Sequence, residues 1–301
     1  MNRMTVARPV SVPAEGASLG LFTGNPAAIT IEPANAGTGV RFAIGDAEPF
    51  AASIEHLDTR PVHPATAALG ARHTAVAASD QSQPIYTVEH LLGALSGVGI
   101  TDALVRIDAR EAPYEVPIFD GSAKPFTEAI AVAGVTGLDT PLDYVVLPRP
   151  VEVTQGDAVV RCDPCFPEDA AFSYELEYDH PFLGSQSAEW QMGNVAGFAA
   201  AVAPARTFSL EEEAKLAQSA GLFAQFTPRD LLVIGAHGPI DNELRFGNEP
   251  AAHKLLDLVG DLALAAHELG GPIAMRVRAY KSGHALHHLA AQAIVRAVRG
   301  I

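Results

Sequence analysis

The stretch EPAAHKLLDLVGDLALAAHEL, residues 249–269, predicts one long helix with polar and apolar positions on different faces. His253, Asp257 and Asp261 recur every four residues, so they form one stripe along the helix. Most other positions are apolar, which predicts a buried helix, and a buried carboxylate needs a partner charge or a metal. A His and an Asp four residues apart can both reach one zinc ion. On spacing alone, the stripe is either a metal site or a solvated polar face.

Signals for both ends flank this helix, with Asn248 as the N-cap, Pro250 in the first turn and Gly270-Gly271 as the stop. A strand at 273–280 and a final helix at 283–298 are expected after it. Before it, the patterns predict strands at 27–31, 40–44, 103–108, 144–147, 158–162, 172–178 and 231–234, and helices at 87–96, 126–132 and 210–220.

Each half of the chain therefore has several strands followed by helices, which is an α+β arrangement repeated twice. Residues 134–142 are interpreted as a linker between the halves. We expect an N-terminal domain at residues 1–136 and a C-terminal domain at residues 137–301.

Composition and charge limit the class of protein. Of the 301 residues 48% are hydrophobic, which excludes disorder as the main state because such a chain can bury enough surface. The net charge of −15 repels phosphate backbones and argues against nucleic acid as a partner. No apolar stretch approaches the ~20 residues that cross a bilayer, and the first residues lack a signal-peptide core. We expect a cytoplasmic monomer.

The run Thr87-Val88-Glu89-His90 opens the first helix of the N-terminal half, with Thr87 as its cap. Neighbours on a helix point about 100° apart, so Glu89 and His90 suit different tasks. His90 could bind a metal while Glu89 acts as general base on the metal's water. The alternative is a helix start that favours an acid through the macrodipole. The chain has no HExxH, which excludes the commonest zinc-protease signature.

The run Tyr280-Lys281-Ser282-Gly283-His284 lies where a strand leads into the last helix. Amides at a helix start, with Lys281 and His284 beside them, could bind an anion. An N-cap by Ser282 is the alternative. The remaining histidines, His287 and His288 among them, are interpreted as surface or hydrogen-bonded core residues.

Two further motifs are less specific. Thr207 in Ala-Arg-Thr-Phe precedes a predicted helix, where a threonine is usually a cap. Cys162 and Cys165 have the spacing of a metal knuckle, but no second CxxC exists to complete a structural zinc site. We interpret them as two buried or partly buried thiols; a redox or structural-zinc role is the weaker alternative.

Taken together and in this order, these segments resemble the UDP-3-O-acyl-N-acetylglucosamine deacetylase family, the zinc amidases of lipid A biosynthesis. The resemblance extends from about residue 18 to 290, and its matching runs are GLFTGNPAAITIEPANAGTGVRF, YTVEHLLGALSGVGITDALVRI, PYEVPIFDGSAKPF, ARTF, LRFGNEPAAHKLLDLVGDL and AYKSGHALHH. It implies two similar domains, each a small mixed sheet with two helices, packed helix layer to helix layer as a β-α-α-β sandwich.

The resemblance also implies roles for individual residues. Zinc, or Fe²⁺ in the cell, would be bound by His90, His253 and Asp257, with water in the fourth position and Glu89 as general base. His284, oriented by Asp261, would assist the leaving amine. The remaining implied residues are Thr207 at the oxyanion and, for substrate binding, Lys254, Lys281 and Phe208. The implied partner is a UDP-linked acylated amino-sugar, with transient contact to a membrane surface.

This chain departs from the family pattern at three places. Phe22 stands where a histidine is usual, residues 72–79 lack the usual cysteine, and residues 223–228 replace a glycine-rich run. These departures leave two other hypotheses open: the same hydrolysis on another acylated amino-sugar, or a paralogue that binds a nucleotide sugar without catalysis.

Overall fold

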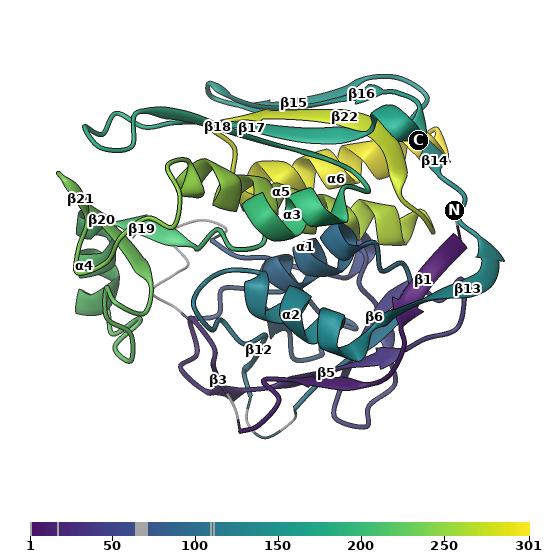
Figure 1. Ribbon diagram of the computed structural model, residues 1–301, viewed down its shortest axis with the longest axis horizontal. Coiled ribbons are helices and arrows are strands. Elements are labelled where there is room, and N and C mark those ends of the chain that lie inside the picture. The colour runs from purple at the N-terminus through teal and green to yellow at the C-terminus, as the bar shows by residue number, and fades with distance from the viewer. Residues whose placement is uncertain (1, 17, 64–71, 109, 111) are drawn as a thin grey trace.

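The computed structural model describes residues 2–16, 18–63, 72–108, 110 and 112–301. Its main body has four layers, in which two layers of helices lie between two sheets (Figure 1). The predicted α+β class, with helices packed on helices between the sheets, is confirmed.

The N-terminal half contains a mixed five-stranded sheet. Its central strand β11 runs antiparallel to β5 and parallel to β6, and every second residue of β11 is fully buried. Two helices, α1 and α2, lie over this sheet (Figure 1). In sheet order the strands are β2 (Val10–Val12), β5 (Ile29–Pro33), β11 (Ala103–Ile107), β6 (Val40–Ile44) and β7 (Phe50–Ala51); the helices are α1 (Glu89–Val98) and α2 (Lys124–Ala133).

Short strands connect this sheet to the start of α1. They form a four-stranded sheet and a hairpin, and a 3-10 helix precedes β8. The elements are β12 (Tyr114–Glu115), β10 (Ile85–Tyr86), β9 (Ala75–Val76) and β8 (Leu57–Asp58) in sheet order, β3 (Ser18–Leu19) paired with β4 (Pro26–Ala27), and the 3-10 helix Ile54–His56.

The C-terminal half forms the other outer layer, a sheet in which β22 runs antiparallel to β16 and parallel to β17. Helices α5 and α6 pack between this sheet and the N-terminal half (Figure 1). The elements are β15 (Val151–Gln155), β16 (Ala158–Pro164), β22 (Ile273–Tyr280), β17 (Ala171–Glu177) and β18 (Ser185–Gln191) in sheet order, β14 (Val145–Val146) beside β22, the 3-10 helix Pro167–Asp169, α3 (Val195–Ala201), α5 (Glu249–Glu268) and α6 (His284–Arg299).

A smaller unit projects from this half at the left of Figure 1. It contains β19 (Phe208–Leu210), α4 (Glu211–Ser219), β20 (Leu232–Gly235) and β21 (Gly238–Pro239). Leu232 and Ile234 of this unit form a small separate core with Leu183, which lies between β17 and β18. The main core is one cluster to which both halves contribute.

Two glycines let α1 and α5 approach closely. A Cβ at Gly260 would lie 2.0 Å from the carbonyl oxygen of Glu89, and a Cβ at Gly93 would lie 2.6 Å from a methyl carbon of Leu256. Side chains cannot be accommodated at the first distance, so glycine is required where the helix backbones meet. The contact brings the start of α1 against the middle of α5.

The predicted linker at 134–142 is wrong. Residues Val135–Pro141 form strand β13, which pairs with the antiparallel strand β1 (Asn2–Val6). Most residues of β13 are exposed, so no apolar alternation marks it, and its partner lies at the other end of the half. The proposed domain division between residues 136 and 137 stays a prediction, and that position lies inside β13. The patterns also missed α3, β15 and β18.

Candidate metal centre and active site

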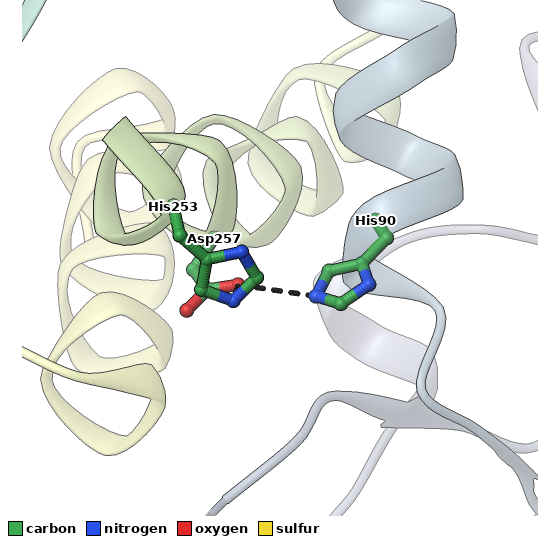
Figure 2. A group of neighbouring side chains, drawn as sticks. All are labelled: His90, His253 and Asp257. Atoms are coloured by element: carbon green, nitrogen blue, oxygen red, sulfur yellow. Dashed lines mark ion pairs between the residues drawn. The ribbon is translucent and has the colours of Figure 1, made fainter. Parts of the chain in front are cut away.

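His90, His253 and Asp257 lie together where α1 meets α5 (Figure 2). His90 is the second residue of α1, and the other two lie one turn apart on α5. Nε2 of His90 is 3.5 Å, and Nε2 of His253 is 3.4 Å, from Oδ1 of Asp257. All three side chains are buried, so two helices from different halves bring three candidate ligands to one point.

The chemistry of these three groups fits a bound metal ion. Oδ1 of Asp257 is buried and has no hydrogen-bond partner among the described residues, a costly arrangement unless a cation satisfies it. Nδ1 of His253 lies 3.1 Å from the carbonyl oxygen of Ala205, which can only accept. His253 therefore donates from Nδ1 and keeps a lone pair on Nε2, as metal-binding histidines do.

Electrostatics favours the ligand forms of two of these residues. Burial lowers the pKa of His253 to about 3, so its imidazole is neutral. Burial alone would raise the pKa of Asp257, but the positive charges of Lys254 and His284 help to hold it well below its usual range. A neutral imidazole and a carboxylate are the forms that coordinate a metal.

Glu89 lies beside this centre and is also buried. One of its carboxylate oxygens, Oε2, accepts a 3.0 Å hydrogen bond from the backbone N–H of Thr74. Burial raises the pKa of Glu89 to about 7, although His284 and His90 oppose the rise. A carboxyl group that titrates near neutral pH is suited to general base catalysis.

Asp261 holds two histidines through one oxygen. Its Oδ2 lies 2.9 Å from Nδ1 of His284 and 2.7 Å from Nδ1 of His287, so both rings donate to it. Burial alone would lower the pKa of His284, but Asp261 and Asp257 raise it to about 9. His284 therefore carries a proton at neutral pH, and its Nε2 lies 3.7 Å from Oδ2 of Asp257. A proton donor, His284, thus lies beside the carboxylate of the candidate metal centre.

Of the other predicted residues, Lys254 and Phe208 lie next to the centre. Nζ of Lys254 donates to Oδ2 of Asp257 at 3.0 Å and lies 5.8 Å from the ring centroid of Phe208. Thr207 directly precedes β19 rather than a helix, and its N–H donates to the carbonyl of Gly121. The alternative that Thr207 is a helix cap is therefore wrong.

The ammonium group of Lys281 pairs with two carboxylates that are not among the candidate site residues. Its Nζ lies 2.8 Å from Asp157 and 3.1 Å from Glu177, both exposed carboxylates. Within the described part of the chain, Lys281 makes no hydrogen bond or ion pair with the candidate metal ligands, and an anion at Lys281 would have to compete with two carboxylates.

Two of the three predicted caps are wrong. Thr87 has a φ of 60° and donates to Glu115, and the N-cap of α1 is Val88. Ser282 bonds to the side chain of His287, and the N-cap of α6 is Gly283. Asn248 is the N-cap of α5 as predicted, but its side chain donates to the carbonyl of Ser187 instead of accepting from the helix. Thr87 and Asn248 thus use a tertiary partner in place of the local backbone N–H that a cap would bind.

Glu115 connects the start of α1 to a loop. Its buried carboxylate accepts the Thr87 hydroxyl at 2.7 Å and the backbone N–H groups of Phe22 and Thr23 at 3.2 and 2.9 Å. A positive φ at a β-branched residue is strained, so these contacts hold Thr87 in a conformation that it rarely adopts. Glu115 thereby fixes the turn that leads into Glu89.

The sequence patterns missed several residues of this cluster. Thr74, Glu115 and the pair Arg206 and Glu249 were not singled out, and nothing local marks them because their partners lie far away in the chain. His287 and His288 were expected to be surface or hydrogen-bonded core residues, and they are buried and hydrogen-bonded.

The comparison with known proteins gives one consistent result. The family model LpxC, described as UDP-3-O-acyl N-acetylglycosamine deacetylase, matches residues 3–296. The chain belongs to this deacetylase family. Among its curated relatives, each named UDP-3-O-acyl-N-acetylglucosamine deacetylase, a Geobacter protein (strain M21) is 40% identical over 90% of this chain and 82% of its own.

Two further relatives carry the same name. A protein of Anaeromyxobacter (strain Fw109-5) is 36% identical over 99% of this chain and 88% of its own. One of Thermosynechococcus vestitus is 35% identical over 96% of this chain and 94% of its own. The predicted family and the predicted class of enzyme, an N-deacetylase, are confirmed.

The departures from the family pattern lie close together in this deacetylase. The ring centroid of Phe22 is 4.8 Å from that of His73 and 5.4 Å from that of Phe223. The three segments that differ therefore meet in one aromatic cluster. The two cysteines are free, with Cys162 buried and Cys165 partly buried, as expected.

Arg206 and Glu249 anchor the start of α5 in the deacetylase. Glu249 is fully buried and accepts from Arg206 Nε at 2.7 Å, from Arg206 Nη2 at 3.1 Å and from the Arg245 backbone N–H at 2.7 Å. Replacing Arg206 with Met is expected to lower the free energy of unfolding by about 3–5 kcal/mol, because it leaves a buried carboxylate without its cation. Urea unfolding measures the change.

The control for Arg206→Met is Arg276→Met, which removes an exposed ion pair with Asp169. That change should cost less than about 1 kcal/mol because water screens an exposed pair. Equal losses from the two substitutions would contradict the assignment of Arg206 as an anchor.

Proposed function

We propose that this deacetylase hydrolyses the N-acetyl group of its substrate with zinc held by His90, His253 and Asp257. The observation that carries the proposal is the buried Asp257 Oδ1, which has no hydrogen-bond partner in the described part of the chain and faces two histidine Nε2 atoms. Two imidazoles and one carboxylate with an open position are typical of catalytic zinc. Fe²⁺ accepts the same donor types and is the alternative ion.

The family acts on UDP-3-O-acyl-N-acetylglucosamine and releases acetate in lipid A biosynthesis. When bound, zinc supplies a Lewis acid that polarises the acetamide carbonyl and lowers the pKa of water. Glu89 accepts the proton of the attacking water, which its raised pKa near 7 supports. His284 protonates the departing amine, and its hydrogen bond to Asp261 keeps Nε2 as the donor.

The substrate-binding assignments rest on less direct support. Lys254 contacts both Asp257 and the ring of Phe208. These contacts support the proposal that Lys254 supplies a positive charge, and Phe208 an apolar surface, beside the scissile amide. We propose that the Thr207 hydroxyl donates to the oxyanion and that Lys281 exchanges its carboxylate partners for the diphosphate. The substrate's acyl chain would bring the enzyme into transient contact with a membrane surface.

No helix in the described ranges is long and apolar enough to cross a membrane. We propose that the enzyme works in the cytoplasm. The two free thiols support this proposal, because cysteines stay reduced in that compartment. We propose a monomer as the active form, since one chain supplies every group named above.

The test is acetate release from UDP-3-O-(3-hydroxyacyl)-N-acetylglucosamine by protein carrying one equivalent of zinc. We expect turnover with zinc and none after chelation. Zinc binding with turnover only on a different acylated amino-sugar would favour the second hypothesis, for which the aromatic cluster at Phe22, His73 and Phe223 is the specific reason. Zinc binding with no turnover on any of these substrates would favour the non-catalytic paralogue.

A further inference from the structure

Thr74 is a fully buried threonine that contacts both proton-transfer groups of the site. Its backbone N–H donates to Glu89, and its hydroxyl donates to Asp261, which orients His284. We propose that Thr74 is a positioning residue that fixes the general base and the Asp261–His284 pair relative to each other. This inference rests on the proposed roles of Glu89 and His284.

The backbone of Thr74 is held against the start of α1 by two hydrogen bonds. Its N–H donates to Oε2 of Glu89 at 3.0 Å, and its carbonyl accepts the N–H of Val88 at 3.1 Å. Val88 is the N-cap of α1. Thr74 therefore binds both the turn that begins the helix and the carboxylate of its first residue.

The donor and acceptor roles of the Thr74 hydroxyl follow from counting the available protons. Asp261 is a carboxylate, which can only accept, so the single hydroxyl proton of Thr74 goes to Oδ1 of Asp261. His288 Nε2 lies 2.7 Å from the same hydroxyl oxygen and must then be the donor. A directed chain follows, from His288 through Thr74 to Asp261.

The hydrogen bonds from His288 through Thr74 also affect the second carboxylate oxygen of Asp261, Oδ2. With Oδ1 held by Thr74, Oδ2 accepts from Nδ1 of both His284 and His287. His287 is in turn held through Nε2 by the Ser282 hydroxyl at 2.9 Å. Every partner of Asp261 is thus a donor, and the His284 proton on Nδ1 is fixed, so the orientation of Asp261 determines where His284 Nε2 lies.

Thr74 joins groups that belong to different elements of the fold. It precedes β9, whereas Glu89 begins α1, Asp261 lies on α5 and His284 begins α6. Because a displacement of about 1 Å in a reacting group can cost about 100-fold in rate, a bridge between the base and the acid has direct catalytic value.

The test compares Thr74→Val, which keeps the shape and the backbone bonds, with Thr74→Ser, which keeps the hydroxyl. Thr74→Val should lower kcat by about 10–100-fold, as the loss of supporting hydrogen bonds does elsewhere. KM and bound zinc should stay within about 3-fold of the wild type, because the change spares the substrate and metal contacts. Thr74→Ser should restore most of kcat. Equal kcat for Thr74→Val and the wild type would overturn the inference.

His288→Asn provides a second arm. On its own it should lower kcat and leave bound zinc unchanged, a comparison that also serves if Thr74→Val fails to fold, and an unchanged kcat would contradict the inference. If His288 acts through the Thr74 hydroxyl, its substitution should lower kcat less in the Thr74→Val background than in the wild type. Fully additive losses would show that the two residues act separately and would contradict the proposed chain.

A readout without substrate separates this inference from the proposed function. The Nδ1 protons of His284 and His287 should give NMR resonances that shift in Thr74→Val and return in Thr74→Ser, because linked hydrogen bonds polarise one another. If the wild type releases no acetate, the proposed function fails while this spectrum still decides the role of Thr74. Unchanged resonances in Thr74→Val would refute it.

Discussion

Glu89→Gln is expected to lower kcat for acetate release by about 100- to 10,000-fold, the range that general acid–base catalysis contributes. Glutamine has nearly the same shape as glutamate, and its amide oxygen can still accept the N–H of Thr74 that now reaches Oε2. It cannot accept a proton from water. The loss therefore measures proton transfer rather than the structure of the start of α1.

Two measurements accompany the Glu89→Gln assay. Bound zinc should be unchanged, because none of the three proposed ligands is altered. Glu128→Gln is the matched control, since Glu128 lies exposed on α2, where it pairs with Lys124. A Glu89→Gln protein that keeps more than a tenth of the wild-type kcat would remove Glu89 from the role of general base.

His253→Ala is expected to weaken zinc binding by more than about 100-fold. Loss of a residue that only supports a ligand costs up to about 100-fold, and loss of a ligand itself should cost more. It removes one of three ligands and also leaves the Ala205 carbonyl without its donor. Activity should fall to background at one equivalent of zinc, because the metal that polarises the carbonyl is no longer held. Zinc content after dialysis and acetate release measure the two effects.

His267→Gln is the matched control for this substitution. His267 lies on the same helix, and burial lowers its pKa to about 4, but it contacts none of the proposed ligands. The control should keep its zinc. Retention of one tightly bound zinc by His253→Ala, or equal loss in both variants, would mean that the centre at α1 and α5 does not hold the metal.

Much of the fold could be predicted because its signals are local. The expected helix at 249–269 corresponds to α5, a long and mostly apolar segment that is buried over most of its length. The expected strand at 103–108 corresponds to β11, in which burial alternates. Strand β13 could not be predicted in this way. It is mostly exposed, and its pairing with β1 joins residues more than a hundred positions apart.

In the candidate site, too, some features follow from local sequence patterns and others depend on distant contacts. The four-residue spacing of His253 and Asp257 is a property of one helix, so the sequence alone placed both on one face. The spacing left a metal site and a solvated face open, and the family resemblance implied the role of ligands. The hydroxyl groups of Thr87 and Ser282 also suggested local roles as caps. The Thr87 hydroxyl makes a tertiary contact with Glu115 instead, and the Ser282 hydroxyl bonds to the His287 side chain in the first turn of α6.

The sequence by itself determined the helix that carries the stripe, the family, and the residue types of the candidate metal centre, because periodicity and motif order need no knowledge of distant contacts. Only the tertiary structure decided how His90 meets α5, which depends on the close approach of two helices at Gly260. It alone revealed Thr74, whose partners Glu89 and Asp261 lie 15 and 187 residues away. Hydrogen bonds across such separations follow from packing, and no local pattern encodes them.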